Sequence, residues 1–205
     1  MNGASRPTLR FVILAAGFST RLGQPKTLAR VRGVSLIRST VRLLAPLAAS
    51  KIMVVIPPRA VRIRAEVPGR QTLWVENLQR ASGLASSVRR GLTAARRGAA
   101  VMLLPVDLAH LKRRDLERLI ARWEGARRRV IATRYGAHGG APLIVPRWLY
   151  SRAQLIRGDR GLQDLIGSLP PEHLTLVSLP GATHDIDTPQ DLRRARRRAT
   201  SRGMR

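Results

Sequence analysis

The residues best suited to chemistry lie on a glycine-rich stretch near the start of the chain. The apolar run Phe11–Ala16 predicts a buried strand, and Gly17, Arg21, Gly23 and Lys26 follow it. Glycines let backbone N–H groups approach a ligand closely, and a turn at the end of a strand can cradle phosphate. Arginine can hold two phosphate oxygens, and lysine adds a mobile point charge. The spacing fits neither the P-loop nor the dinucleotide glycine motif, so it predicts a triphosphate site of another kind.

Two aspartates are placed where they could hold a metal ion beside this turn. Asp107 follows an apolar run, at the carboxyl end of a predicted strand, and Asp187 precedes Thr188 at the start of the last predicted helix. Magnesium is commonly held by one or two carboxylates together with substrate phosphates. We therefore predict that Asp107 and Asp187 bind Mg²⁺. A turn or helix-capping role is the alternative for Asp107, Asp185 and Asp187, and Asp191 is expected to complement the helix N-terminus.

The elements that must position these side chains alternate between strands and helices. Ser35 is placed to cap the first predicted helix, and the early strands are nearly continuous Val, Ile and Leu, as in a sheet covered on both faces. The pattern predicts an α/β fold with a doubly wound, mainly parallel sheet, helices on both faces, and a small antiparallel element near 130–145. The apolar runs with strand character are Phe11–Ala16, Lys51–Ile56, Thr72–Glu76, Ala100–Pro105, Val130–Thr133, Pro142–Val145 and Leu174–Ser178.

The length of 205 residues favours one domain, which we assign to residues 1–198. The last helix is predicted at Pro189–Arg198, and residues 199–205 are expected to form a disordered basic tail. The chain has no cysteine, which excludes a disulfide framework. No apolar run has the length of a signal peptide or a membrane span, so we expect a cytoplasmic protein that does not bind membranes.

The charge of the chain is strongly positive, with 38 basic and 12 acidic residues and a net charge of +26. Such an excess favours polyanions as ligands. The basic residues are spread along the whole chain, however, and aromatic residues, which stack on single-stranded bases, make up only 3%. We therefore expect no specific binding of nucleic acid, and a general preference for anionic ligands.

Five stretches together resemble the MobA-like nucleotidyltransferases, and most closely their molybdenum cofactor cytidylyltransferase (MocA-like) branch. The first, LAAGFSTRLGQPK at 14–26, is similar to the family signature L-A-A-G-x-S-x-R-[ML]-G-x-P-K. The other four occur in the family's order across residues 11–193: NLQRASGLASSVRRGL at 77–92, MLLPVDLAHL at 102–111, GAHGGAPLIVPR with IRGDRGLQDLI at 136–166, and HDIDTPQDL at 184–192. One departure is Ala109, because the family commonly has Asp-x-Pro where this chain has Asp107-Leu108-Ala109. We expect a looser loop there.

The resemblance implies a fold like that of the nucleotide-diphospho-sugar transferases, which is Rossmann-like, and an Mg²⁺-dependent transfer of a nucleoside monophosphate. The Ala-Ala-Gly and Pro-Lys pattern at 15–17 and 25–26 resembles the cytidylyl branch and favours CTP, with the phosphate of the molybdenum cofactor as acceptor and pyrophosphate as product. A molybdenum hydroxylase or its chaperone is an implied partner. The catalytic residues are expected to be Arg21, Lys26 and Asp107. The nucleotide-binding residues are expected to be Leu14, Ala15, Ala16, Gly17, Arg21, Lys26, Asn77, Gly83, Ser86 and Ser87. The acceptor-binding residues are expected to be Gly139, Gly140, Pro142 and Asp159, with the first three on a loop at 136–142.

Two other functions remain open at this level. One is a transferase of the same fold that uses a sugar phosphate or another small phosphate acceptor. The other, from a different class, is a basic nucleic-acid-binding protein on an inactive transferase fold. The presence of Arg21, Lys26, Asp107 and Asp187 argues against the second alternative.

Overall fold

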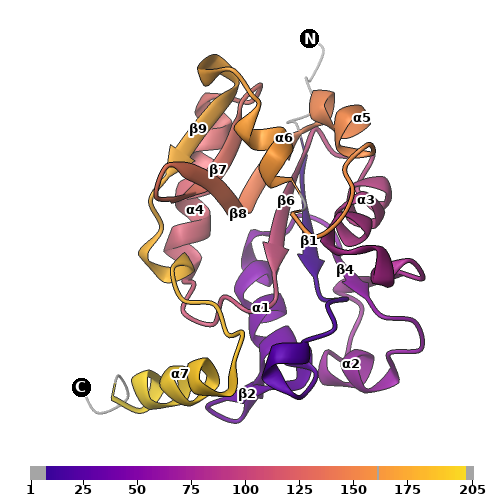
Figure 1. Cartoon of the computed structure of the whole chain (residues 1–205), viewed down its shortest axis with the longest axis vertical. Helices are drawn as coiled ribbons and strands as arrows, with labels where there is room; N and C mark the ends of the chain where they lie inside the picture. Colours follow the sequence, from indigo (N-terminus) through magenta and orange to yellow (C-terminus); the bar gives the residue numbers. More distant parts are fainter. Residues whose placement is uncertain (1–7, 161, 202–205) are drawn as a thin grey trace.

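A seven-stranded sheet forms the centre of the computed structural model, which describes residues 8–160 and 162–201 (Figure 1). The strand order is β5-β4-β1-β6-β8-β7-β9, so the first strand of the chain lies inside the sheet between β4 and β6. The seven strands are β1 (Leu9–Leu14), β4 (Ile52–Ile56), β5 (Thr72–Glu76), β6 (Ala100–Pro105), β7 (Val130–Tyr135), β8 (His138–Pro146) and β9 (Leu174–Val177).

The sheet is mainly parallel, as the sequence predicts. Strand β1 runs parallel to β4 and β6, β4 to β5, and β7 to β9, whereas β8 is antiparallel to both β6 and β7. The predicted antiparallel element is thus the hairpin β7–β8, which is part of the central sheet. The loop predicted at 136–142 is wrong, because β8 already begins at His138 and includes Gly139, Gly140 and Pro142.

Helices cover both faces of the sheet and bury two apolar layers. Alternate residues of β1 face opposite layers: Phe11 and Ile13 belong to the cluster with α1, α4 and α7, and Val12 belongs to the cluster with α3, α5 and α6. This alternation follows from the period-two geometry of a strand, and it requires a strand that is apolar throughout. The helices are α1 (Leu36–Leu44), α2 (Val61–Glu66), α3 (Leu84–Ala94), α4 (Arg113–Gly125), α5 (Tyr150–Ala153), α6 (Gln163–Gly167) and α7 (Pro189–Ser201).

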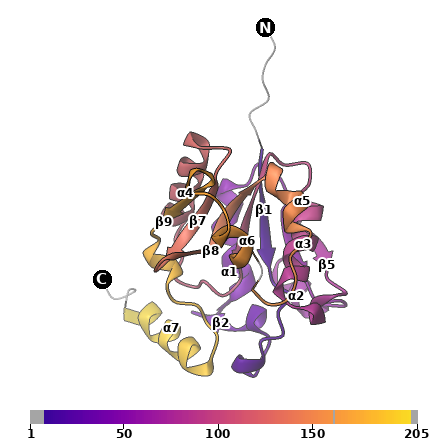
Figure 2. The same ribbon diagram turned by 45° about the horizontal axis from the view of Figure 1, so that its top comes forward.

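The last helix lies beside the short hairpin of β2 (Arg30–Val31) and β3 (Val34–Ser35), at the edge of the molecule (Figure 2). The Nε of Arg196 donates to the backbone oxygen of Arg30 at 3.0 Å. The helix reaches Ser201, so the predicted boundary at residue 198 falls inside it, and residues 202–205 of the predicted tail lie outside the described residues. Within the described chain, the helices are all too short or too polar to cross a membrane.

Candidate functional site

The turn after β1 is folded back on itself, which brings Arg21 and Lys26 to the same edge of the sheet. Ser19 and Gly23 both adopt left-handed backbone conformations, with φ of 58° and 70°, and short 3₁₀ turns follow each of them. The backbone N–H of Lys26 donates to the Oγ of Ser19 at 3.0 Å. Ser19 therefore closes the turn that carries both cations. The resemblance did not identify this serine as a site residue.

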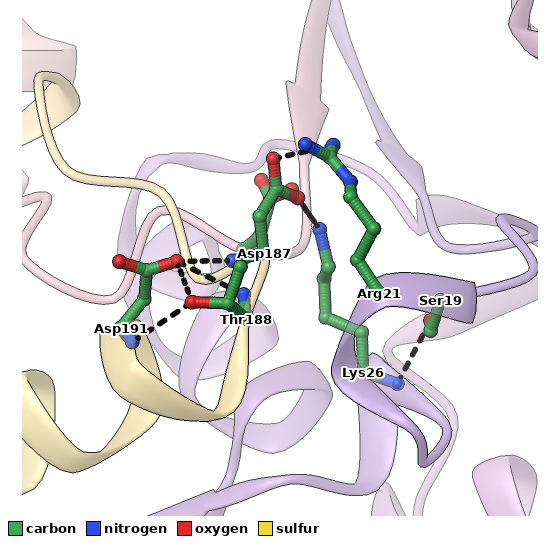
Figure 3. Close-up of polar contacts among 7 residues, drawn as sticks. Ser19, Arg21, Lys26, Asp187, Thr188 and Asp191 are labelled. Carbon is green, nitrogen blue, oxygen red and sulfur yellow. Dashed lines mark hydrogen bonds and ion pairs between the residues drawn. The ribbon is translucent and has the colours of Figure 1, made fainter.

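Lys26 contacts both of the predicted metal ligands, and Figure 3 shows its contact with Asp187. Its Nζ lies 2.7 Å from Oδ2 of Asp107 and 2.6 Å from Oδ1 of Asp187, while Nη2 of Arg21 lies 2.7 Å from Oδ2 of Asp187. The side chains of Lys26 and Asp107 are only 15% and 17% exposed, whereas that of Arg21 is 71% exposed. The structure thus brings together the four residues that the sequence predicts at the centre of the site, with Arg21 at its open side.

Backbone contacts hold the two aspartates next to each other although they are 80 residues apart. The carbonyl oxygen of Asp107 accepts hydrogen bonds from the N–H of Ile186 at 3.2 Å and from the N–H of Ala109 at 3.0 Å. The Ala109 bond is one that a proline could not make. The loop that lacks the family's proline is therefore fixed by a local hydrogen bond and by the segment that carries Asp187.

Asp187 is also held by the cap of α7. Oδ2 of Asp191 accepts from the N–H and the Oγ1 of Thr188 at 2.9 and 2.7 Å and from the N–H of Asp187 at 3.3 Å, and the N–H of Asp191 donates to Thr188 Oγ1 at 3.2 Å. These hydrogen bonds hold the pKa of Asp191 below its usual value. Asp191 is therefore a capping residue that also fixes the backbone of a predicted metal ligand (Figure 3).

Burial and ion pairing have opposite effects on the charged groups at the centre of the site. Burial alone would lower the pKa of Lys26, but the charges and hydrogen bonds of Asp107 and Asp187 outweigh it, and the pKa is raised. Burial raises the pKa of Asp107, with a smaller contribution from the charge of Asp185, and Lys26 opposes this rise. The 2.7 Å contact is that of an ion pair, so we treat Asp107 as ionised at neutral pH. Burial thus works against the charged form of Asp107, and the contact with Lys26 favours it.

These carboxylates fit a metal ion that binds together with substrate. Within the described ranges, no cluster of three or more His, Cys, Asp or Glu could hold a metal. Asp107 and Asp187 both reach one ammonium, which places their oxygens around a single point. Mg²⁺ usually takes one or two carboxylates and completes its shell with phosphates and water. The donor set therefore suits a metal–nucleotide complex rather than a closed metal site built from protein alone.

Tyr135 is a further residue of the site that the motifs did not predict. Its hydroxyl lies within hydrogen-bond distance of the carbonyl oxygens of Ala141 and Ala182, at 2.6 and 3.0 Å. Burial, followed by the negative charges of Asp185 and Asp107, raises its pKa to about 12. Tyr135 thus faces the carboxylates from the end of β7, on the side of the hairpin β7–β8.

The predicted acceptor-binding glycines have packing roles in β8. A Cβ on Gly140 would lie 2.8 Å from the ring of Tyr135, and a Cβ on Gly139 would lie 3.0–3.2 Å from Leu176, Ala132 and Ile166. Pro142 is buried in the same strand, where its carbonyl oxygen accepts from the Oγ1 of Thr133 at 2.7 Å. Binding of an acceptor at Gly139, Gly140 or Pro142 remains a prediction.

Asn77, which follows β5, bonds to the two predicted nucleotide-binding serines of α3. The Nδ2 of Asn77 donates to the Oγ of Ser86 and of Ser87 at 2.8 and 3.0 Å, and its Oδ1 accepts from the N–H of Gln79. All three predicted residues are at most 5% exposed. These contacts fix the start of α3 against β5, and direct contact with a nucleotide remains a prediction.

Gly83 and Asp159, predicted for opposite halves of the site, lie against each other. A Cβ on Gly83 would lie 2.6 Å from Asp159 Oδ1 and from the Gly158 backbone, and the φ of Gly83 is +88°. Asp159 Oδ1 also accepts from the N–H of Leu84 at 3.3 Å. The segment that the resemblance assigns to the acceptor therefore packs on the N-terminus of α3, on the predicted nucleotide side.

The backbone after β1 is held in the sheet and then opens to solvent. The N–H of Ala15 donates to the carbonyl oxygen of Val55 at 2.8 Å. Ala15 and Ala16 are buried, Leu14 is half-buried, and a Cβ on Gly17 would meet nothing within 4 Å. The side chains of the two alanines therefore belong to the core, and the chain is open to a ligand from Gly17 onward.

Arg80 is a second residue that the sequence motifs did not identify. Its guanidinium lies 3.9 Å from the ring centre of Phe18, and its Nη2 donates to the carbonyl oxygen of Gly17 at 3.2 Å. These contacts join the β5–α3 connection to the glycine-rich turn, beside a cavity of about 280 Å³.

The family of the chain follows from comparison with known proteins. Residues 11–174 match the model of the MobA-like NTP transferase domain. The chain belongs to this family. It is therefore a nucleotidyltransferase. The cations and carboxylates described above lie near the carboxyl ends of the strands, where open α/β sheets bind their ligands. No curated protein matches the chain in sequence.

Solved structures with this fold cover nearly the whole chain. The protein Rv0371c from Mycobacterium tuberculosis is 25% identical, with a TM-score of 0.78 over 94% of this chain and 99% of that one; it has also been solved in complex with manganese. A nucleotidyl transferase from Methanothermobacter is 22% identical (TM-score 0.79; 97% and 100% covered). Molybdopterin-guanine dinucleotide biosynthesis protein A from Archaeoglobus fulgidus is 16% identical (TM-score 0.71; 94% and 99% covered). These likenesses confirm the predicted fold.

Proposed function

We propose that this nucleotidyltransferase moves CMP from CTP to the phosphate of the molybdenum cofactor and releases pyrophosphate, with Mg²⁺ bound at Asp107 and Asp187. The observation that carries the proposal is the contact of one ammonium, Lys26, with both carboxylates. Together with Arg21, this arrangement offers cations for a triphosphate and two oxygen ligands for the metal that accompanies it. The manganese complex of the mycobacterial structure supports a divalent ion in this fold.

The reaction needs charge neutralisation and alignment more than it needs a general base. An oxygen of the acceptor phosphate forms a bond to the α-phosphorus of the nucleotide, and the bond from that phosphorus to the bridging oxygen breaks. Pyrophosphate leaves with the electron pair. A phosphate monoester has its second pKa near 6, so the attacking oxygen is already largely ionised at neutral pH. The protein therefore contributes by holding both partners in line.

Arg21 and Lys26 would have different roles in this reaction. Arg21, which is exposed and bound to Asp187 at one end only, can turn its guanidinium toward the β- and γ-phosphates. Lys26 holds oxygens of Asp107 and Asp187 together. If these two carboxylates held a dication instead, the ammonium of Lys26 would be free to contact the α-phosphate. Bound Mg²⁺ would supply positive charge to the oxygens of the triphosphate.

The preference for CTP rests on the residues of the first turn. The sequence Ala15-Ala16-Gly17 with Pro25-Lys26 is the pattern of the cytidylyl branch, and a 2-C-methyl-D-erythritol 4-phosphate cytidylyltransferase from Thermus thermophilus shares the fold. The acceptor preference rests on the IRGDRGLQDLI and HDIDTPQDL stretches. With that acceptor, the product would pass to a molybdenum hydroxylase or its chaperone in the cytoplasm.

The test is pyrophosphate release from purified protein with Mg²⁺ and each of CTP, GTP, ATP and UTP. Each nucleotide is assayed without an acceptor, with molybdenum cofactor, and with glucose 1-phosphate as a representative sugar phosphate. We expect release only with CTP and molybdenum cofactor. Faster release with GTP would overturn the cytidylyl assignment, and release with glucose 1-phosphate alone would replace the acceptor by a sugar phosphate.

A further inference from the structure

A second cavity lies behind the loops that carry the two aspartates. It has a volume of about 690 Å³ and opens between α1, the β2–β3 hairpin, the start of α4 and the segment from Pro180 to His184. None of Arg21, Lys26, Asp107 and Asp187 lines it. Its volume lies within the range of small-molecule sites. The cavity is therefore large enough for a ligand of its own, separate from the proposed CTP site.

The walls of this cavity combine an apolar floor with a cationic rim. Val34, Leu36 and Leu111 contribute apolar surface. Five cations line the cavity: Arg32 of the hairpin, Arg42 of α1, Lys112 before α4, Arg114 on α4 and Arg198 of α7. Asp115 is the one carboxylate among the lining residues. It is 4% exposed, and its Oδ2 accepts from the N–H of Lys112 at 2.9 Å. Asp115 is thus engaged as a helix cap and leaves the rim strongly positive.

Three of these cations have no partner within residues 8–160 and 162–201. No ion pair or side-chain hydrogen bond is formed there by Arg32, Arg42 or Arg114. Two other arginines of the same region, Arg30 and Arg38, both pair with Glu66. Arg30 and Arg38 are therefore paired with a carboxylate, whereas Arg32, Arg42 and Arg114 of the cavity wall are not. Like charges gathered without counterions repel each other, and an anion bound between them relieves that repulsion.

Arg32, at the rim, has an unusual backbone conformation. Its φ is 51° and that of Gly33 is 73°, as in a tight hairpin turn whose two central residues are both left-handed. Asn or Gly is the common choice at the first of these positions, because a larger side chain costs free energy there. An arginine at this position is consistent with a role for its charge.

We propose that this cavity binds a second anionic ligand: a phosphate-bearing small molecule with a flat or apolar body. The guanidinium groups of Arg42 and Arg114 can hold phosphate oxygens in pairs, and the apolar floor can cover the body of the ligand. The proposal does not depend on which nucleotide or acceptor the main site uses.

The probe is 1-naphthyl phosphate, which joins an apolar ring to a phosphate, and its binding is measured by isothermal titration calorimetry at low salt. Inorganic phosphate and 1-naphthol test each half of the probe alone. We expect the wild-type protein to bind 1-naphthyl phosphate more tightly than either. The double variant Arg42→Ala/Arg114→Ala should weaken this binding at least tenfold. The matched control Arg97→Ala/Arg118→Ala removes two exposed arginines elsewhere and should change it less than twofold.

Lys26→Ala separates the two sites, and we expect it to leave the affinity for 1-naphthyl phosphate within twofold of wild type. The proposal is overturned if the wild-type protein does not bind the probe, or if the cavity variant binds it as tightly as the control variant. It is equally overturned if Lys26→Ala weakens binding as much as the cavity variant does, because the probe would then sit in the main site. Binding of poly-glutamate without binding of the probe would assign the surface to an acidic protein instead. Because all the substituted arginines are exposed, melting curves should confirm that each variant is folded.

Discussion

At the scale of single residues, the site is organised around one shared ammonium. Lys26 contacts Asp107 and Asp187, and each of these carboxylates comes from a different loop. Without Lys26, the two carboxylates would lie close together with no positive charge between them and would repel each other. The lysine therefore holds oxygens of both aspartates around one point, where a dication with its nucleotide could bind.

Asp107→Asn and Asp187→Asn should each abolish turnover while the fold is retained. Asparagine keeps the size of the side chain but removes the charge that would hold the cation. The loss of charge neutralisation should cost several kcal/mol of barrier, on the order of 10³-fold in rate. The measurement is CTP-dependent pyrophosphate release at saturating Mg²⁺, with circular dichroism for each variant.

The control for these substitutions is Asp164→Asn on α6. It removes one charge from the exposed ion pair between Asp164 and Arg160. It should leave the rate unchanged. The double variant Asp107→Asn/Asp187→Asn should be little slower than either single variant, because both disable one unit. If Asp107→Asn keeps more than about a tenth of the wild-type rate, a loss of less than about 1.4 kcal/mol, then Asp107 does not anchor the metal.

The tyrosines provide a prediction for pH that is independent of catalysis. The chain has only two, Tyr135 and Tyr150. Burial raises the pKa of both, and at Tyr135 the charges of Asp185 and Asp107 add to the rise, to about 12. Because both pKa values are raised, the neutral forms are favoured in the folded protein, and stability should fall as the pH rises above about 10, where free tyrosine ionises.

Spectrophotometric titration checks this directly. In the folded protein, phenolate absorbance should stay low near pH 10 and rise only toward pH 12, whereas in urea it should be half-developed near pH 10. Asp185→Asn should shift the Tyr135 transition to lower pH by removing a nearby negative charge, and Tyr135→Phe should remove that transition altogether. Half-ionisation of both tyrosines near pH 10 without unfolding would contradict the burial and charge environment described here.

At the scale of elements, strands could be predicted where burial on both faces makes the sequence apolar throughout. Strands β1, β4 and β6 follow runs of this kind. The cap at Ser35 is also confirmed, by its hydrogen bond from the N–H of Arg38. The start of β8 could not be predicted in this way. Its residues His138–Ala141 include two glycines, which normally indicate a loop. Here the glycines make room for the ring of Tyr135 and for core side chains.

The centre of the site was predictable, and its surroundings were not, for a physical reason. Lys26, Asp107 and Asp187 are charged side chains at strand or helix ends, so both their chemistry and their position can be read locally. The roles of Tyr135 and Arg80 depend on contacts between segments far apart in the chain, such as Tyr135 with Ala182. Nothing in the spacing of the sequence indicates such contacts.

Gly83→Ala tests how the start of α3 is joined to the 157–159 segment. The added Cβ would meet backbone atoms of Gly158 at 2.6 Å, and the φ of +88° is unfavourable for alanine. We expect a loss of about 1–3 kcal/mol in the free energy of unfolding, measured by urea denaturation. Gly167→Ala is the matched control, because its Cβ would meet nothing within 4 Å. Equal stability of the two variants would show that the contact is not tight.

At the scale of the whole molecule, the positive charge is general and not confined to one surface. Arginines line the cavity behind the aspartate loops, a smaller cavity beside β5, and the exposed positions of α7. Such a distribution attracts anionic substrates over a distance and raises their association rate at low salt. Attraction of this kind acts on any polyanion and does not depend on base sequence.

We therefore predict that nucleic acid binds weakly and without sequence preference. The affinity for a 20-base-pair duplex should fall steeply between 50 and 200 mM salt, with a slope of about −0.9 in log K against log salt for each phosphate contacted. Two duplexes of unrelated sequence and equal length should give the same curve in fluorescence anisotropy. The variant Arg196→Ala/Arg197→Ala on α7 should weaken both equally and reduce the slope, because each arginine acts through phosphate contacts alone. A preference for one sequence that persists at 150 mM salt would contradict this prediction. It would mean that the protein binds nucleic acid specifically and that its basic residues do not serve only to attract anionic substrates.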